Sequence, residues 1–302
     1  MKVIGIGETV LDIVFDSQDR PVSAKPGGSV YNALISIARS GHEATLISEV
    51  GDDHVGRMIR GFLRSNGVGD DDVAVYEGSR SPLALAFLDK DKNAQYQFYK
   101  DYPAQRLDFV MPTVERGDIL LFGSYFALNP AIRHQVLQVL RAGREGGALL
   151  FYDLNFRSTH NGEAAALRPA MEENMRLAHV VKGSDEDIRN AFGTDDWRKA
   201  YAETISTLCP YFICTQGAGG ATLLCPWGES HISALPISPV STIGAGDSFN
   251  AGTVCGLLDA GATARDTASA AFAQTLATAM AKGRDFSAEV CQSLDNYIAP
   301  RH

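Results

Sequence analysis

The most informative part of the sequence is residues 243–249, which read I-G-A-G-D-S-F and lead into a long helical pattern. Because Gly244, Ala245 and Gly246 are small, they leave the backbone N–H groups at the start of that helix uncovered, and such groups bind phosphate oxygens. Asp247 falls in the first helical turn, where its carboxylate can accept the proton of an attacking hydroxyl. On these residues alone, an ordinary helix cap explains the segment equally well.

A second glycine-rich loop lies near the start of the chain, at residues 25–32, which read K-P-G-G-S-V-Y-N. The adjacent Gly27 and Gly28 permit close approach of the backbone to a ligand. Asn32 lies one turn into the helix that the loop opens, and its amide offers both a donor and an acceptor to a neutral hydroxyl. A tight turn with a solvated Asn32 is the alternative.

The rest of the chain predicts an α/β fold with a doubly wound, mostly parallel sheet flanked by helices. Short β-prone runs alternate with helical stretches, which is the pattern of such sheets. The predicted strands of the sheet cover residues 2–7, 44–50, 118–123, 148–153, 180–181 and 211–215. The predicted helices cover residues 29–40, 55–65, 131–144, 163–177, 196–208, 246–259 and 263–281.

Two pairs of predicted strands have no helix between them and so interrupt the alternation of strands and helices. Residues 83–88 and 95–100 are β-prone and are joined by the polar turn 89–93, which predicts a hairpin. An inserted hairpin is a candidate lid over a site, and a plain edge hairpin is the alternative. Residues 220–225 and 231–235 form the other pair. Since no repeat or linker occurs, we expect one domain over residues 1–302.

Polar groups also follow several predicted strands, at the edge where open α/β sheets bind ligands. Asp12 lies just past the first strand and can accept hydrogen bonds from two sugar hydroxyls. Asn155 and Arg157 follow the strand at 148–153, and Arg157 can pair with a phosphate or lie in a surface ion pair.

Two more polar segments follow the last predicted parallel strands. Residues 184–187, which read S-D-E-D, can hold a magnesium ion through water or form an ordinary acidic first turn of a helix. Residues 215–220, which read T-Q-G-A-G-G, suit either a nucleotide or a simple hairpin turn. Each segment is ambiguous by itself, but all of them fall at the carboxyl ends of strands of one predicted sheet.

Composition excludes several classes of protein. The formal net charge of -9 argues against a nucleic-acid surface, which needs a basic face. No run of about 18 apolar residues predicts a membrane span, and Glu8 and Asp12 interrupt any signal-peptide core, so we expect a cytoplasmic protein without a membrane partner. The five cysteines form no C-x-x-C pair, which favours reduced thiols. Gly5 and Gly7 form only an isolated G-x-G, a weak sign of a dinucleotide-binding oxidoreductase.

Three segments in this order resemble the ribokinase-like (PfkB) carbohydrate kinase family over essentially the whole chain. They are residues 27–32 (G-G-S-V-Y-N), 51–56 (G-D-D-H-V-G) and 244–247 (G-A-G-D). The resemblance implies an ATP-dependent sugar kinase that uses Mg²⁺, with a β lid at about residues 10–24 and 82–102. Exposed lid strands have an edge that a partner can cover, which suggests a homodimer through the lid. The segment Asp153–Arg157, with Asp, Asn and Arg at alternate positions, is most familiar in fructokinase-like members, which favours fructose as the substrate.

The resemblance also implies roles for individual residues. Asp247 is similar to the catalytic base, and Gly244, Ala245 and Gly246 to the anion hole. The implied sugar contacts are Asp12, Gly27, Gly28, Asn32, Asn155 and Arg157. The implied nucleotide contacts are Ser184, Thr215, Gly217 and Gly219, with Asp187 near the metal.

The chain departs from the family pattern at two places. Ser241 stands where the family usually has an Asp that helps to bind potassium, so one charge of ligand field is missing and activation by K⁺ is not expected. Residues 184–187 stand where the family has N-x-x-E, with Ser184 for Asn and Asp187 for Glu. These departures are the reason for one alternative, a non-catalytic sugar- or nucleotide-binding protein. Within the kinase class, a ribokinase or a 2-keto-3-deoxygluconate kinase is the alternative to a fructokinase.

Overall fold

The computed structural model describes residues 1–88, 94–104 and 106–301, and the predicted polar turn 89–93 lies outside them. Its main sheet confirms the predicted doubly wound, mostly parallel α/β fold. The strands of this sheet run in the order β14-β13-β12-β11-β10-β9-β1-β4-β5, and β6 also pairs with β4. Their bounds are β1 Val3–Ile6, β4 Ala44–Gly51, β5 Val68–Gly69, β6 Val73–Tyr76, β9 Ile119–Gly123, β10 Leu149–Asp153, β11 Val180–Ser184, β12 Phe212–Thr215, β13 Ala221–Cys225 and β14 Gly228–Ile232.

The central strands form because their apolar runs are covered on both faces. Every residue of β1, β9 and β10 is buried, and these strands pair in parallel. At one end of the sheet, β12, β13 and β14 pair antiparallel. The predicted strand at 231–235 was wrong in position, because Cys225 pairs with Gly228 and the chain turns at once through Pro226 and Trp227.

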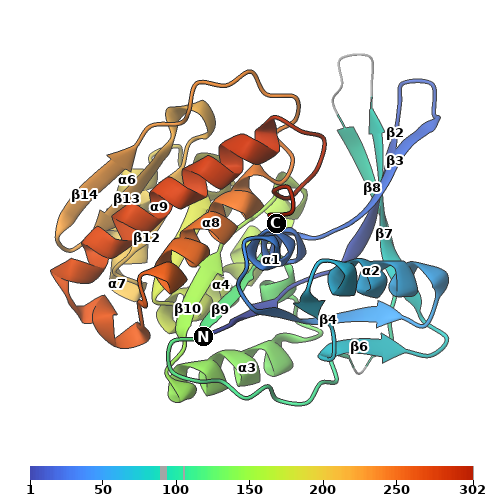
Figure 1. The fold of residues 1–302 in the computed structure, drawn as a ribbon, viewed down its shortest axis with the longest axis horizontal. Coiled ribbons are helices and arrows are strands. Elements are labelled where there is room, and N and C mark those ends of the chain that lie inside the picture. Colours follow the sequence, from blue (N-terminus) through green and yellow to red (C-terminus); the bar gives the residue numbers. More distant parts are fainter. Residues whose placement is uncertain (89–93, 105, 302) are drawn as a thin grey trace.

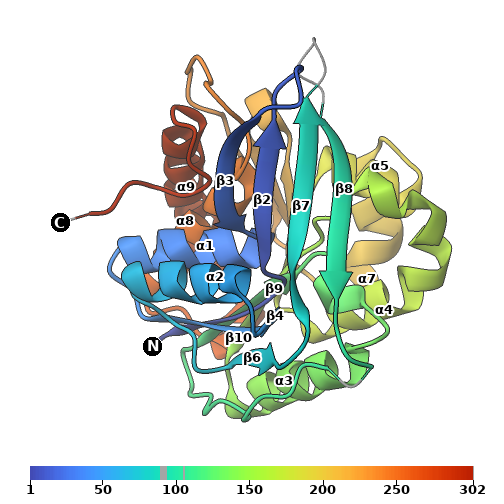
Figure 2. The ribbon, with the colours of Figure 1, turned by 90° about the vertical axis from the view of Figure 1, so that its right-hand side faces the viewer.

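Helices cover the two faces of the sheet as two layers (Figures 1 and 2). One layer holds α1 Ser29–Arg39, α2 His54–Ser65, α8 Ala245–Asp259 and α9 Ala270–Cys291. The other layer holds α3 Arg133–Gly146, α4 Ala164–Leu177, α5 Asp185–Phe192, α6 Trp197–Ala200 and α7 Ser206–Leu208. Short 3₁₀ turns connect the elements at η1 Phe126–Leu128, η2 Ser158–Glu163, η4 Gly217–Gly219 and η5 Ala264–Ala268. Each layer buries its own apolar cluster against one side of the sheet.

Two predicted helices have a different form in the structure. The stretch at 196–208 is divided by a π-helical turn, η3 Tyr201–Ile205, between α6 and α7. The stretch at 263–281 begins as η5 and continues as α9, which runs on to Cys291. The apolar periodicity located both segments but could not show these local changes of helical geometry.

A second, four-stranded sheet projects from the edge of the main domain (Figure 1), and Figure 2 shows this sheet face-on. Its strands run in the order β3-β2-β7-β8, with β2 Val10–Phe15, β3 Pro21–Gly27, β7 Arg80–Leu88 and β8 Ala94–Asp101. The predicted hairpin at 83–88 and 95–100 corresponds to β7 and β8, which pair antiparallel. Since β2 pairs in parallel with β7, two segments far apart in sequence form one sheet. The two edge strands, β3 and β8, each pair with one strand and have no second neighbour among the described residues.

Candidate active site

The N-terminus of α8 is built around glycine. Gly244 is the N-cap residue with φ of 79°, a left-handed conformation that suits glycine, and a Cβ there would lie 2.5 Å from the carbonyl oxygen of Asn296. Within the described residues, the N–H groups of Gly246 and Asp247 have no hydrogen-bond acceptor. These free N–H groups, together with the positive end of the helix dipole, make a site suited to an anion.

Asp247 does not cap this helix. Among the residues that the structure describes, no side chain makes a cap hydrogen bond at the N-terminus of α8, so the alternative of an ordinary cap is wrong. Instead Asn32 Nδ2, on α1, donates a 2.9 Å hydrogen bond to Asp247 Oδ2. Burial raises the pKa of Asp247 to about 7, although the bond from Asn32 and the nearby Arg157 and Lys182 lower it. A carboxyl group with such a pKa exchanges a proton readily near neutral pH.

The loop 25–32 brings three predicted sugar-binding residues together. A Cβ on Gly27 would lie 2.4 Å from Asp12 Oδ2 and 3.8 Å from Asn32 Oδ1, so these groups converge on the glycine. Gly28 has φ of 130°, and a Cβ there would meet the carbonyl oxygen of Glu8 at 2.2 Å. Asn32 Oδ1 is buried and has no protein hydrogen-bond partner among the described residues, so this acceptor is available to a ligand hydroxyl. Burial, with the nearby Glu8, raises the pKa of Asp12 to about 6.

The carboxyl ends of β9 and β10 bring further polar groups to the same edge. Ser124 and Asn155 have positive φ values of 55° and 37°, conformations that non-glycine residues rarely adopt and that cluster at functional sites. Ser124 Oγ donates a 2.5 Å hydrogen bond to Glu8 Oε2, and burial raises the pKa of Glu8. Arg157 is exposed and lies close enough to Glu8 and Asp247 to lower the pKa of each. Sequence reasoning found Asn155 and Arg157 but missed Glu8 and Ser124.

A buried ion pair between Lys182 and Asp153 packs against the N-terminus of α8. Lys182 Nζ is 3.1 Å from Asp153 Oδ1, and Asn250 Nδ2 donates a 2.8 Å hydrogen bond to Asp153 Oδ2. The sequence reasoning assigned no role to Lys182 or Asn250. The signal available for Lys182 was a charged residue inside an apolar strand, since residues 180–184 read V-V-K-G-S.

Ser184 and Asp187 form a capping box at the start of α5. Asp187 Oδ2 accepts from the Ser184 N–H at 2.7 Å, and Ser184 Oγ accepts from the Asp187 N–H at 3.0 Å. An acidic first helical turn, the alternative to a metal site, therefore accounts for this segment. No cluster of three His, Cys, Asp or Glu side chains in the described parts of the chain could hold a metal ion. These residues do not fit a magnesium site made by protein groups alone.

The loop after β12 lies next to this segment. Thr215 pairs with Ser184 on the neighbouring strand β11, so two predicted nucleotide contacts are adjacent. Gly217 and Gly219 bound the exposed turn η4, which joins β12 to the antiparallel β13, so the loop does form a hairpin connection. Its role toward a nucleotide stays a prediction.

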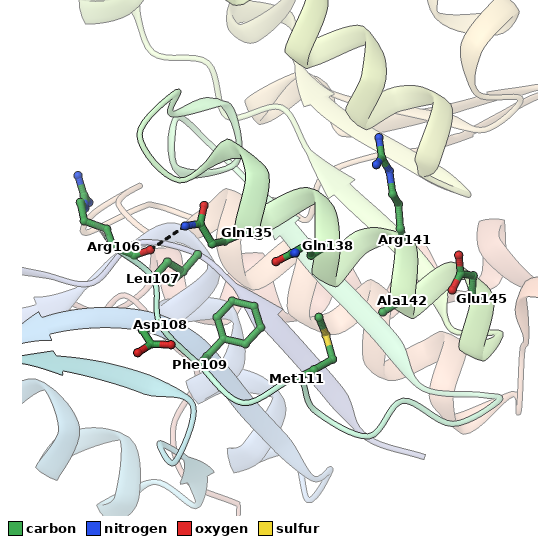
Figure 3. Close-up of a pocket in the computed structure, with 10 residues that line it drawn as sticks. All are labelled: Arg106, Leu107, Asp108, Phe109, Met111, Gln135, Gln138, Arg141, Ala142 and Glu145. Carbon is green, nitrogen blue, oxygen red and sulfur yellow. Dashed lines mark hydrogen bonds between the residues drawn. The ribbon is translucent and has the colours of Figure 1, made fainter. Parts of the chain in front are cut away.

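A separate cavity of about 580 Å³ lies away from these residues (Figure 3). It is lined by residues 106–109, Met111 and one side of α3, and Gln135 Nε2 donates a 3.1 Å hydrogen bond to the Arg106 carbonyl across it. None of the predicted site residues lines this cavity. No helix within the described residues is both long and apolar enough to span a membrane.

The arrangement defines a class of protein. A set of free N–H groups at a helix N-terminus binds transferring phosphate, and a buried carboxylate beside it accepts a hydroxyl proton. The amide of Asn32 contacts that carboxylate, and Asp12 and Gly27 lie beside Asn32. This is the geometry of a phosphotransferase that acts on an alcohol group.

Comparison with known proteins agrees with this class. The model of the pfkB family carbohydrate kinases matches residues 2–289, so the chain belongs to this family of ATP-dependent sugar kinases. The family predicted from the glycine-rich motifs is thereby confirmed.

The chain shares less than one third of its residues with the fructokinases that it resembles. The chain is 28% identical to probable fructokinase-4 of Arabidopsis thaliana, over 88% of this chain and 85% of the relative. It is 29% identical to fructokinase-1 of Oryza sativa, over 82% of this chain and 80% of the relative. Among solved structures, aminoimidazole riboside kinase from Salmonella enterica, complexed with aminoimidazole riboside and an ATP analog, superposes with a TM-score of 0.82 at 25% identity, over 100% of this chain and 97% of the other.

Proposed function

We propose that this kinase transfers the γ-phosphoryl group of ATP to a hydroxymethyl group of fructose, with Asp247 as the base. The observation that carries the proposal is the position of the Asp247 carboxylate, which is buried in the first turn of α8 beside free N–H groups and is held by Asn32. A hydroxyl bound there meets its proton acceptor and the phosphoryl group at one place. Positioning of this kind supplies most of the catalysis in phosphoryl transfer.

The polar groups around Asp247 suit a sugar. Asp12 and Asn32 lie beside Gly27, where the missing side chain leaves room for the Asp12 carboxylate. Asn155 and Arg157 follow β10 at the same edge of the sheet, and Arg157 can pair with a phosphate oxygen. The four-stranded sheet carries Asp12 and Gly27, so its movement toward the main domain would exclude water from the reacting groups.

The choice of fructose rests on the relatives. Two plant fructokinases match most of the chain, and the alternate Asp153, Asn155 and Arg157 agree with that assignment. Ribose and 2-keto-3-deoxygluconate are the competing sugars. The likeness to an aminoimidazole riboside kinase adds a riboside to the substrates that need testing.

A coupled ADP-release assay over these compounds tests the proposal. Fructose, ribose, 2-keto-3-deoxygluconate and aminoimidazole riboside are compared at equal ATP and Mg²⁺, and kcat/KM is measured for each. We expect fructose to give the highest kcat/KM. A higher value for another compound would replace the substrate, whereas sugar binding without ADP release would indicate a non-catalytic binding protein.

The proposal also covers the metal ion, the oligomeric state and the cellular location of the kinase. Mg²⁺ would be held mainly by the phosphates of ATP, as is usual when few carboxylates are offered, with Asp187 nearby. A homodimer through the four-stranded sheet is supported by its two edge strands and by Phe98 and Tyr99, whose exposed fractions are 63% and 53%. Light scattering of the purified protein measures the dimer directly. A cytoplasmic location stays a prediction.

A further inference from the structure

The buried ion pair between Lys182 and Asp153 has no role predicted from the sequence. Lys182 and Asp153 expose only 4% and 2% of their surface and are register partners on the neighbouring strands β11 and β10. Removing two charges from water costs several kcal/mol per ion, and the mutual attraction of a pair often does no more than offset that cost. A pair buried at this depth beside a reactive site therefore requires a reason other than stability.

Helix α8 contacts this pair at two points. Asn250 lies one turn after Asp247 and donates its hydrogen bond to Asp153. A Cβ built on Gly246 would lie 3.4 Å from Lys182 Nζ, so the ammonium group packs directly against the anion hole. An ammonium has three N–H donors, and among the described residues Asp153 is the one acceptor that Lys182 Nζ has.

We propose that Lys182 is a positioning residue for phosphoryl transfer, whose buried ammonium holds the N-terminus of α8 and adds a fixed positive charge to the anion hole. Asp153 keeps the ammonium in place, and Asn250 ties the pair to the helix that carries Asp247. A charge fixed in a water-excluded site acts far more strongly than the same charge in water. This inference rests on the proposed function, because it assumes that the transferred phosphoryl group lies at the N-terminus of α8.

Two variants separate the charge of Lys182 from its contribution to folding. Lys182→Met leaves Asp153 buried and unpaired, which we expect to destabilise the protein. Adding Asp153→Asn removes the second charge, and the new amide oxygen still accepts the hydrogen bond from Asn250. We expect this double variant to unfold in urea at nearly the wild-type midpoint, while its kcat stays at least about tenfold below the wild-type value. Recovery of both stability and kcat would overturn the proposal and leave a purely structural ion pair.

The pH dependence of kcat/KM gives a second test of the charge of Lys182, one that does not depend on how Lys182 contributes to folding. Lys182 is faced by Asp153, by Asp187 on α5 and by Asp247, and Asp247 is faced by Arg157, Asp153 and Lys182. In Asp153→Asn alone, the ammonium acts on Asp247 without an opposing carboxylate, so the acid limb of kcat/KM moves to lower pH. Adding Lys182→Met removes that charge and moves the limb back to higher pH. Identical limbs in the two variants would contradict the proposal.

A binding measurement distinguishes failure of this inference from failure of the proposed function. Calorimetry with ATP and with ADP, without any sugar, compares the wild type with the double variant. We expect the double variant to lose at least about threefold more affinity for ATP than for ADP, because only ATP carries the phosphoryl group that reaches the added charge. Equal losses would overturn the role of Lys182. If the wild type phosphorylates no sugar, the proposed function fails, and the ATP-to-ADP comparison still decides the role of Lys182.

Discussion

Asn32 Nδ2 and Asp247 Oδ2 lie 2.9 Å apart across 215 residues of sequence, and this bond joins the two glycine-rich motifs into one site. One motif opens α1 and the other opens α8, and both helices lie in the same layer of the fold (Figure 1). The amide that is predicted to bind the sugar therefore also orients the predicted base. If both roles hold, substrate binding and proton transfer are coupled through the Asn32 side chain.

Replacing Asp247 by Asn tests the base. The amide of Asp247→Asn keeps the size of the side chain but cannot accept a proton, so we expect kcat to fall roughly 10²–10⁴-fold. Sugar affinity, measured by calorimetry, should change little, because Asn32 can still reach the side-chain oxygen. Turnover at the wild-type rate would show that another group takes the proton.

Removing the hydrogen bond from Asn32 to Asp247 should shift the pH dependence of kcat/KM to higher pH. The pKa of Asp247 is about 7, so we expect wild-type kcat/KM to fall as the pH drops through about 7 and the carboxylate becomes protonated. The bond from Asn32 stabilises the carboxylate, and its loss in Asn32→Leu raises the pKa further. The acid limb should therefore move to higher pH, and the KM for the sugar should rise.

The control for this profile is the residual activity of Asp247→Asn, which should lack the limb near pH 7. Asp12 also has a raised pKa, of about 6, and would contribute a lower limb that persists in this control. An unchanged limb in Asn32→Leu would contradict the assignment of the titration to Asp247.

A methyl group at Gly27 should damage the sugar site selectively. The added Cβ in Gly27→Ala would lie 2.4 Å from Asp12 Oδ2, so the carboxylate must move. We expect the KM for the sugar to rise about tenfold or more, which corresponds to about 1.4 kcal/mol of lost binding, while the KM for ATP changes little.

Gly61→Ala is the matched control for this substitution. Gly61 lies inside α2, and no atom lies within 4 Å of a Cβ built there. We expect normal kinetics and a gain of about 0.5–1 kcal/mol in the free energy of unfolding, measured in urea, because alanine favours the helix. A similar rise in the KM for the sugar in both variants would show that the effect is not local to Asp12.

The sequence located the elements whose signal is local. Strands buried on both faces read as continuous apolar runs, so β9 and β10 were predicted within a residue of their observed bounds. The predicted site residues Asn32 and Asp247 meet because each lies in the first turn of a helix of one layer. Asp12 was predicted to lie just past the first strand, but it lies within β2 of the four-stranded sheet, which brings it to Gly27 at the end of β3.

The remaining features depend on pairings that no local pattern encodes. Asp153 and Lys182 are 29 residues apart, and Asp153 and Asn250 are 97 apart, so their contacts follow from strand order and helix placement. The hydrogen bond between Ser124 and Glu8 likewise requires β9 to lie beside β1. The capping box at Ser184 could have been recognised from its spacing, but the same residues also match a metal-linked motif of the family.

We expect the neutral residue Ser241 to determine how the activity depends on potassium. Ser241 is half-buried and neutral, and its Oγ accepts a 3.2 Å hydrogen bond from the N–H of Ile243, just before the anion hole. Since a carboxylate is missing there, we expect kcat/KM in K⁺ and in Na⁺ at equal ionic strength to agree within about twofold. Ser241→Asp should raise the ratio of the two values, whereas Ser241→Ala, which removes the hydroxyl without adding charge, should not. Strong activation of the wild type by K⁺ would show that backbone oxygens alone hold the ion.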